Sequence, residues 1–356
     1  MKGISFLRRF SKAIQADDRK TTARMMREYI WFKLTKPSVA EQYFIKYLFR
    51  TDSGDYRDYL NTHRHNQVFW NIYDPSFAPI MDKKDLFEVY FTHCGINVAR
   101  SLLHNDGVVF YNKEQMELIT TPEDFVKYLQ SLNIKRSLFI KKKQDSFGGR
   151  NIFKARIEDL NDTAYLGQIY REVIRSGYIF QNEIIQHREM NRLNPYCVNS
   201  LRIVVYTNKS QKENLMSASL RTALRKIYVD NVSNGGGSIP VDMEEGVLTG
   251  NIYTDFEKGR GKVWKRHPVT NMEIKGFKIP YYKEARKLAL EASSALPQIS
   301  LIGWDIAITP EGPLIIEGNK SPDLNFQEVA QKGFRRNPVY ASLMKDHLAG
   351  ANFTSK

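Results

Sequence analysis

Apolar side chains recur at helical spacing near the N-terminus, with basic residues between them. The apolar positions are Phe6, Leu7, Phe10 and Ile14, and the basic ones are Arg8, Arg9 and Lys12. This spacing predicts an amphipathic helix, and residues 1–80 as a whole are predicted to be helical and basic. Such a helix either packs on the main domain or lies on a membrane surface, and the pattern leaves both interpretations open.

From about residue 81 the pattern changes to alternating helices and strands. Helices are expected over residues 83–92, from residue 121 onward and over 282–296, and short buried strands over 108–111 and 137–141. In the second helix, Thr121 is the expected N-cap, Pro122 lies in the first turn, and Asp124 can complete a capping box. Between residues 200 and 320, β-branched runs and glycine-rich turns dominate. The mixture predicts an α+β or α/β enzyme domain.

Composition narrows the classes of protein. The 356 residues include no apolar run long enough to span a bilayer and no secretory signal, so a cytoplasmic location is expected. Two distant cysteines, Cys94 and Cys197, support neither a disulfide framework nor a zinc site. The net charge of +14 favours anionic partners such as nucleotides, sugar nucleotides or anionic lipid, and leaves peripheral contact with the inner face of a membrane open. Nucleic acid is the weaker option, because no zinc-finger, RRM or helix-turn-helix signature accompanies the charge.

The segment 301–319 predicts a β-hairpin with its turn at residues 310–312. Alternation along the strands places apolar residues on one face, namely Trp304, Ile306, Ile308, Leu314 and Ile316. Asp305, Glu317 and Asn319 then share the other face, with Asp305 opposite Glu317. Like charges directly opposite each other destabilise a hairpin, and neither strand carries Lys or Arg, so a bound cation is expected. Oxygen ligands are those that Mg²⁺ prefers, although a solvated acidic face is the alternative.

A second motif begins at the strand 137–141. Lys141 ends this strand, and a loop of small residues with Ser146, Gly148 and Gly149 follows. Backbone N–H groups in such a loop approach phosphate oxygens closely, so the segment predicts a phosphate site. The Gly-Lys-Ser/Thr ending of a Walker A loop is missing, and an ordinary hairpin turn is the alternative interpretation.

Together, the lysine strand, its glycine loop, a hinge and the carboxylate hairpin resemble the ATP-grasp superfamily. Residues 85–335 resemble most closely the sugar-transfer-associated ATP-grasp family. The matching stretches are Gln181-Asn182-Glu183 with Gln186-His187, Val198 to Arg202, Leu220-Arg221, Val229 to Asn231 with Gly235 to Gly237, Pro240 to Asp242, His267-Pro268, Ile302 to Asp305, and Glu317 to Asn319. The resemblance implies an α+β ATP-grasp fold of two α+β subdomains clasping ATP. The expected domains are a basic helical N-terminal region (1–80), a pre-ATP-grasp α/β subdomain (81–135) and the ATP-grasp domain (136–350).

The same resemblance implies a role for each candidate residue. ATP would be bound by Lys141, Ser146, Gly148 and Gly149 at the phosphates, and by Gln181, Glu183, Ile184 and Ile185 at the adenine hinge. Arg202 and Arg221 would face the γ-phosphate or an acyl phosphate, and with Lys141 they are the expected catalytic residues. Mg²⁺ would be held by Asp305, Glu317 and Asn319, and the two carboxylates would reach ATP through it. Asn199 is a further candidate near the phosphates, for which a turn or strand-end role is equally compatible.

Three positions depart from the family pattern. Lys142 and Lys143 follow Lys141 where the family usually has Pro. Arg150 stands where the glycine loop more often carries Lys, and Lys320 replaces a small residue after Asn319. The first two departures suggest more basic phosphate contacts.

Three functions are compatible with these residues. The resemblance implies an Mg-ATP-dependent ligase that joins a carboxylate to an amine through an acyl phosphate, in polysaccharide or glycan-related biosynthesis. Its partners would be a small carboxylate and an amine or sugar acceptor. The alternative is a kinase acting on a hydroxyl, with Asp230 or Asp323 as general base. A nucleotide-bound scaffold without turnover is the third hypothesis, suggested by the basic N-terminus.

Overall fold

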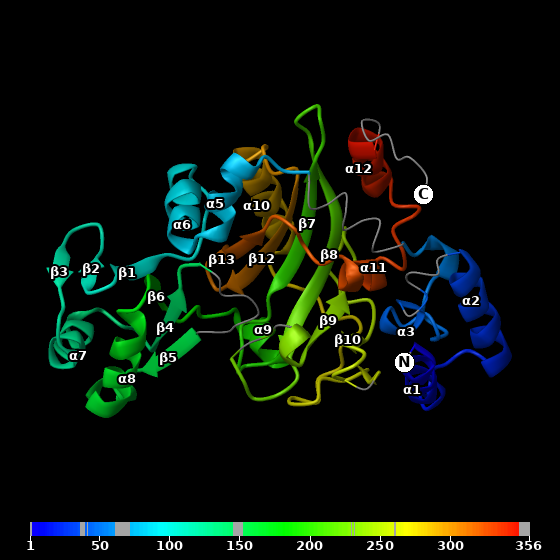
Figure 1. Cartoon of the computed structure of the whole chain (residues 1–356), viewed down its shortest axis with the longest axis horizontal. Helices are drawn as coiled ribbons and strands as arrows, with labels where there is room; N and C mark the ends of the chain where they lie inside the picture. The colour runs from blue at the N-terminus through cyan, green and yellow to red at the C-terminus, as the bar shows by residue number, and fades with distance from the viewer. Residues whose placement is uncertain are drawn as a thin grey trace. The chain divides into compact units, whose positions relative to one another are not determined.

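The computed structural model describes residues 2–35, 40, 42–60, 72–144, 152–228, 230, 232–259 and 261–348. The chain forms two compact units (Figure 1). Unit 1 consists of residues 1–74, 186–313 and 318–356, and unit 2 of residues 75–185 and 314–317. The domain boundaries predicted at residues 80 and 135 came from the family resemblance, and they stay predictions.

Unit 2 is built on a six-stranded sheet in the order β3-β2-β1-β6-β4-β5, in which all the recorded neighbours are antiparallel. The strands are β1 (Ser101–Asp106), β2 (Val109–Tyr111), β3 (Met116–Leu118), β4 (Ser137–Lys142), β5 (Ile152–Arg156) and β6 (Tyr178–Asn182). The helices are α5 (Ala78–Asp82), α6 (Lys84–His93), α7 (Pro122–Ser131) and α8 (Thr163–Val173). Apolar residues of α7, α8 and the sheet form one core, with Phe125, Leu166 and Phe180 fully buried.

Unit 1 contains most of a seven-stranded sheet in the order β11-β10-β9-β8-β7-β12-β13. The strands are β7 (Leu201–Thr207), β8 (Glu213–Ala223), β9 (Gly236–Pro240), β10 (Ile252–Thr254), β11 (Val263–Trp264), β12 (Leu301–Thr309) and β13 (Gly312–Asn319). Helix α10 (Tyr282–Ala295) packs against β7, β8 and β12, and the shorter α11 (Asn325–Ala330) and α12 (Pro338–Leu348) pack against β8. The short helix α9 (Arg188–Leu193) precedes β7. Strands β7 and β12 are buried almost throughout, so the polar side chains they carry need partners inside the protein.

The N-terminal helices are part of unit 1. They are α1 (Lys2–Ile14), α2 (Thr22–Thr35) and α3 (Gln42–Ile45). Phe6 and Phe10 of α1 join an aromatic cluster, in which the Phe6 ring lies 4.6 Å from that of Tyr29 and 5.8 Å from that of Phe44. Phe6 and Phe10 therefore pack on unit 1, as the packed-helix interpretation expected, whereas Leu7 and Ile14 of the same predicted stripe are exposed. Among the described residues, no helix is both long and apolar enough to cross a bilayer.

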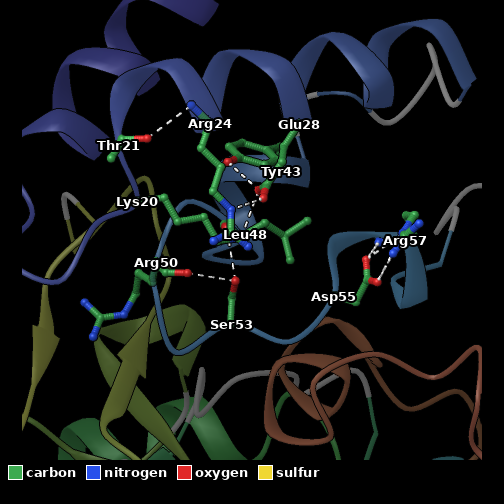
Figure 2. Close-up of polar contacts among 10 residues, drawn as sticks. All are labelled: Lys20, Thr21, Arg24, Glu28, Tyr43, Leu48, Arg50, Ser53, Asp55 and Arg57. Carbon is green, nitrogen blue, oxygen red and sulfur yellow. Dashed lines mark hydrogen bonds and ion pairs between the residues drawn. The ribbon is translucent and has the colours of Figure 1, made fainter.

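A buried carboxylate ties α2 to the segments around it (Figure 2). Glu28 accepts hydrogen bonds from Lys20 Nζ at 2.8 Å, Arg24 Nε at 2.9 Å and the Tyr43 hydroxyl at 3.0 Å. Lys20, Glu28 and Tyr43 are buried, and this desolvation lowers the pKa of Lys20 and raises that of Tyr43. A buried charge without such partners would be strongly destabilising, so the group fixes how α2 packs.

Most predicted elements occur within one or two residues of their expected positions. Thr121 caps α7 by accepting the Asp124 N–H at 3.1 Å, and its hydroxyl contacts the Asp124 carboxylate at 2.7 Å. The hairpin at 301–319 forms, but β13 already begins at Gly312, so the turn is shorter than predicted. Ile315, rather than Leu314 or Ile316, is the fully buried residue of β13. The prediction that Leu314 and Ile316 are the core residues of this strand was therefore wrong.

Candidate active site

Two arginines converge on one carboxylate in unit 1. Arg202 on β7 lies directly opposite Asp305 on β12, and its guanidinium binds both carboxylate oxygens, through Nε to Oδ1 and through Nη2 to Oδ2 at 2.7 Å. Arg221 on β8 donates from Nη1 to Asp305 Oδ2 at 2.9 Å. The Arg202 and Asp305 side chains are buried, whereas the Arg221 side chain is 18% exposed. The group carries a net charge of +1, because two cations share one anion, and Arg221 is its more accessible member.

The backbone around this group is shaped to admit it. A Cβ atom on Gly303 would lie 2.8 Å from Pro322 Cβ and 3.2 Å from Arg202 Nη1, so only glycine leaves room for the guanidinium. Asn319 donates from Nδ2 to the Gly303 carbonyl at 3.5 Å, a long hydrogen bond. Its amide oxygen accepts no hydrogen bond from any residue that the structure describes.

A second carboxylate lies close to the arginine pair. Asp230 Oδ2 accepts hydrogen bonds from the Ser200 hydroxyl and, at 3.1 Å, from the Ser200 backbone N–H. The Ser200 carbonyl in turn accepts the Arg221 N–H at 2.8 Å. Burial raises the pKa of Asp230, and the positive charge of Arg221 opposes this rise.

Asn199 lies in the protein interior, 1% exposed, and its side chain is used by protein groups. Its Nδ2 donates to Gln186 Oε1 at 3.0 Å and to the carbonyls of Met190 and Asn194. Its Oδ1 accepts the Thr222 hydroxyl at 2.7 Å. These contacts join the start of β7 to the end of β8, which is the strand-end role left open by the sequence.

The lysines of unit 2 have a different environment. Lys141 at the end of β4 is half-buried and donates to Gln181 Oε1 on β6 at 3.0 Å. Burial lowers the pKa of Lys141 to about 8, the exposed carboxylate of Glu317 opposes this, and the charge of Lys84 adds to the lowering. Lys84, at the start of α6, likewise has its pKa lowered by burial, with Glu317 opposing. Sequence reasoning missed Lys84, because a lysine at a helix start carries no distinguishing pattern.

The predicted adenine hinge is the irregular segment after β6. Glu183 pairs with Lys154 of β5 at 2.8 Å, a partner that sequence reasoning also missed. The backbone groups of Ile184 and Ile185 make no hydrogen bond to any residue that the structure describes. They are therefore chemically suited to read the edge of a base, while Gln181 and Glu183 are held by lysines.

The lysines after Lys141 serve different purposes. Lys143 is 6% exposed and donates to Asp106 Oδ2 at 2.9 Å and to the Tyr111 hydroxyl at 2.8 Å, with Asp85 at 3.4 Å. Its charge is thus compensated within unit 2, contrary to the expectation that it adds a phosphate contact. Ser146, Gly148, Gly149 and Arg150 lie outside the described residues.

The predicted residues accordingly form two sets. Unit 1 carries Asn199, Arg202, Arg221, Asp305 and Asn319, and unit 2 carries Lys141, Gln181, Glu183, Ile184, Ile185 and Glu317. Within the described part of the chain, no cluster of three or more His, Cys, Asp or Glu side chains could hold a metal ion. The expected magnesium ligands are two carboxylates and an amide oxygen divided between the two units.

A model of the family described as sugar-transfer associated ATP-grasp matches residues 63–339, more than half of the chain. The chain belongs to this family. The predicted fold class, an α+β ATP-grasp fold preceded by a helical N-terminal region, is confirmed. The match includes both sheets of this ATP-grasp protein and starts after the helices α1 to α3.

Matches among solved structures were also found. N5-carboxyaminoimidazole synthetase from Staphylococcus aureus, complexed with ADP, is 10% identical, with 69% of this chain and 46% of that chain covered and a TM-score of 0.40. The biotin carboxylase domain of the Hydrogenobacter thermophilus 2-oxoglutarate carboxylase, complexed with MgADP, is 12% identical, with 78% and 47% covered and a TM-score of 0.45. D-Alanine-D-alanine ligase from Helicobacter pylori is 10% identical, with 75% and 61% covered and a TM-score of 0.41. The ATP-grasp chain thus spans about half the length of the first two proteins. No curated protein matches it by sequence.

Proposed function

We propose that this protein is an ATP-dependent ligase that joins a carboxylate to an amine through an acyl phosphate, in polysaccharide or glycan-related biosynthesis. The observation that carries the proposal is the pair Arg202 and Arg221 converging on Asp305. Planar guanidinium groups bind phosphate oxygens bidentately and stay charged, which suits a transferring phosphoryl group. Membership of the ATP-grasp family supports ATP as the donor.

The residues present fit the nucleotide and its metal chemically. Lys141 supplies a positive charge for the phosphates, and the backbone of Ile184 and Ile185 supplies polar groups for the base. Asp305, Glu317 and Asn319 would hold Mg²⁺, since all three offer oxygen ligands. When bound, that ion neutralises charge on the phosphate oxygens. Asn319 fits this role because its amide nitrogen is turned to Gly303 and its oxygen is left over.

The reaction proceeds in two displacements. A carboxylate oxygen of the first substrate forms a bond to the γ-phosphorus of ATP, and the bond to ADP breaks. The amine nitrogen then bonds to the acyl carbon, inorganic phosphate leaves, and the amine loses a proton to give the amide. Arg202 and Arg221 would stabilise charge on the phosphoryl oxygens in both steps, and Lys141 would orient the phosphates of ATP.

The decisive experiment is an ADP-release screen of carboxylates combined with amines, followed by mass spectrometry of the product. The ligase proposal expects ADP release that depends on both substrates and a product mass equal to their sum minus water. ADP release with an alcohol acceptor and a phosphorylated product would replace it by a kinase.

A kinase is the second candidate because of Asp230. Its carboxylate lies beside Ser200 and near Arg221, and burial raises its pKa, which suits a general base for a hydroxyl. Asp323, the other base considered, is exposed at the N-terminal side of α11 and accepts the Asn325 N–H.

A cytoplasmic location remains a prediction, and contact with an anionic membrane through the basic N-terminal region is a prediction based on charge alone. Arg9 and Lys12 of α1 both contact Glu257, the lysine at 3.1 Å, so part of this positive charge is compensated within unit 1.

A further inference from the structure

Two segments of unit 1 are joined beside the arginine pair. One leads into β7, and the other contains the end of β8 and the residues after it. Asn194 Nδ2 donates to the Ala223 carbonyl at 2.9 Å, and the Ala223 N–H lies 3.5 Å from Cys197 Sγ. Ser200 contacts Asp230 as described above. Residues 194–200 therefore lie beside Ala223 and Asp230, and Arg221 precedes Ala223 by two residues.

These joined segments expose aromatic and basic side chains together. Tyr196 is 46% exposed and Tyr228 is 42% exposed, although both rings are large and apolar. Lys226 Nζ lies over the Tyr196 ring at 5.5 Å from its centroid, and Arg225 beside it is exposed. An exposed aromatic face with cations around it suits a ligand that combines a flat apolar face with negative charge.

Asp230 and Arg221 carry polar groups on the second of these two stretches of chain. Asp230 uses Oδ2 for Ser200, and its Oδ1 accepts no hydrogen bond from the described residues. Arg221 is the partly exposed member of the arginine pair. A carboxylate with one oxygen left over, next to the arginine expected at the acyl phosphate, is chemically suited to receive an ammonium group.

We propose that Tyr196, Lys226 and Asp230 form the binding site for the amine substrate, and that this substrate is an amino sugar carrying an anionic group. The sugar ring stacks on Tyr196, Lys226 binds the anionic group, and Asp230 binds the amine and directs it toward Arg221. The direction of the amine toward Arg221 rests on the proposed ligase function. Binding of the amino sugar can be measured without turnover.

The test measures binding by isothermal titration calorimetry on the full chain with ADP and Mg²⁺ present. Three probes are compared: glucosamine phosphate, glucosamine without the phosphate, and N-acetylglucosamine phosphate without the free amine. We expect glucosamine phosphate to bind roughly tenfold or more tightly than either of the others, as charge-assisted hydrogen bonds predict. Asp230→Asn, which keeps an acceptor for Ser200, should remove the preference for the free amine. Lys226→Met should remove the preference for the phosphate, and Tyr196→Ala should weaken all three probes.

The exposed Lys287 on α10 provides the matched control, since Lys287→Met removes a surface charge elsewhere in unit 1. It should leave all three affinities unchanged. Absence of glucosamine phosphate binding by the unaltered protein would overturn the proposal. So would variants of Asp230 and Lys226 that keep the preferences for the free amine and for the phosphate. A failed ligase function would appear differently, as unaltered binding without any amine-dependent ADP release. Tyr196 and Lys226 are exposed, so their variants report on binding even if Asp230→Asn does not fold.

Discussion

The arginines of unit 1 and the lysines of unit 2 differ in how they respond to burial of a positive charge. Arg202 and Arg221 lie in a largely buried position where Asp305, on β12, accepts hydrogen bonds from both of them. Lys141 and Lys84 respond to burial by a lowered pKa instead. The difference follows from the side chains, because a guanidinium cannot lose its proton within the accessible pH range and an ammonium can. The stability of unit 1 should therefore depend on Asp305 as the counter-ion of the arginines. In unit 2, the charge of the lysines should depend on pH.

Removing the shared carboxylate should have the largest effect. Asp305→Ala leaves two guanidinium groups in a buried position without this partner, and we expect a loss of about 3–5 kcal/mol in the free energy of unfolding. Chemical denaturation followed by circular dichroism measures it. Asp305→Asn, which retains an oxygen acceptor, should lose less, and equal stability of the alanine variant and the unaltered protein would contradict the assigned ion pair.

Lys141 should behave in the opposite way. Lys141→Met removes a charge expected at the phosphates, so ADP binding should weaken by about 1.5–3 kcal/mol, roughly tenfold to more than a hundredfold. Stability without nucleotide should rise by about 1 kcal/mol at neutral pH, because the native state no longer holds a partly enclosed ammonium. Calorimetric titration and thermal unfolding of the same sample separate the two effects. A variant that is both less stable and unaltered in ADP affinity would refute the phosphate role.

A substitution of Lys143 tests whether this lysine stabilises unit 2 or binds phosphate. Lys143→Met removes the contacts to Asp106 and Tyr111 and should cost about 1–2 kcal/mol of stability. ADP affinity, measured by the same titration, should stay within about twofold of that of the unaltered protein. Substitutions at independent sites change each other's free energies by no more than roughly this amount. A marked loss of ADP affinity would restore the idea that this lysine contacts phosphate.

The smallest expected effect is a pH dependence of ADP binding. With its pKa lowered to about 8, Lys141 is mostly charged at pH 7 and mostly neutral at pH 9, so affinity should fall by roughly tenfold over this range. The native state also gains stability as pH rises from this value toward the ordinary lysine pKa, since protonation favours the unfolded chain there. Titrations of Lys141→Arg should show a flat profile, and a parallel fall in both proteins would assign the pH dependence to another group.

Local pattern predicted the elements well, because each prediction depended on residues close in sequence. Thr121 and Asp124 are only three residues apart, and their capping contact occurs as expected. The helix expected over 282–296 is α10, which ends one residue earlier. The buried residue of β13 was less predictable, because Ile315 bonds to the backbone of Asn97 and Ala99, a pairing that alternation within the hairpin does not show.

The environment of the site residues depended on contacts far apart in sequence. The expected cation between Asp305 and Glu317 was inferred from two strands that carry no basic residue. The compensating charge of Asp305 comes from Arg202 and Arg221, about a hundred residues away, through a register that sequence alone does not show. For the same reason the burial of Asn199 and the partners of Lys143 could not be anticipated.

The division of β13 has a consequence for the order in which the protein folds. Leu314–Glu317 belongs to unit 2, and Ile315 bonds to the backbone of Asn97 and Ala99, more than two hundred residues earlier. Unit 2 therefore lacks one of its own segments until synthesis has passed residue 317. During translation, the backbone groups of residues 75–185 that pair with Ile315 stay unpaired while most of unit 1 is made. A fragment ending at residue 185 would keep that unpaired edge.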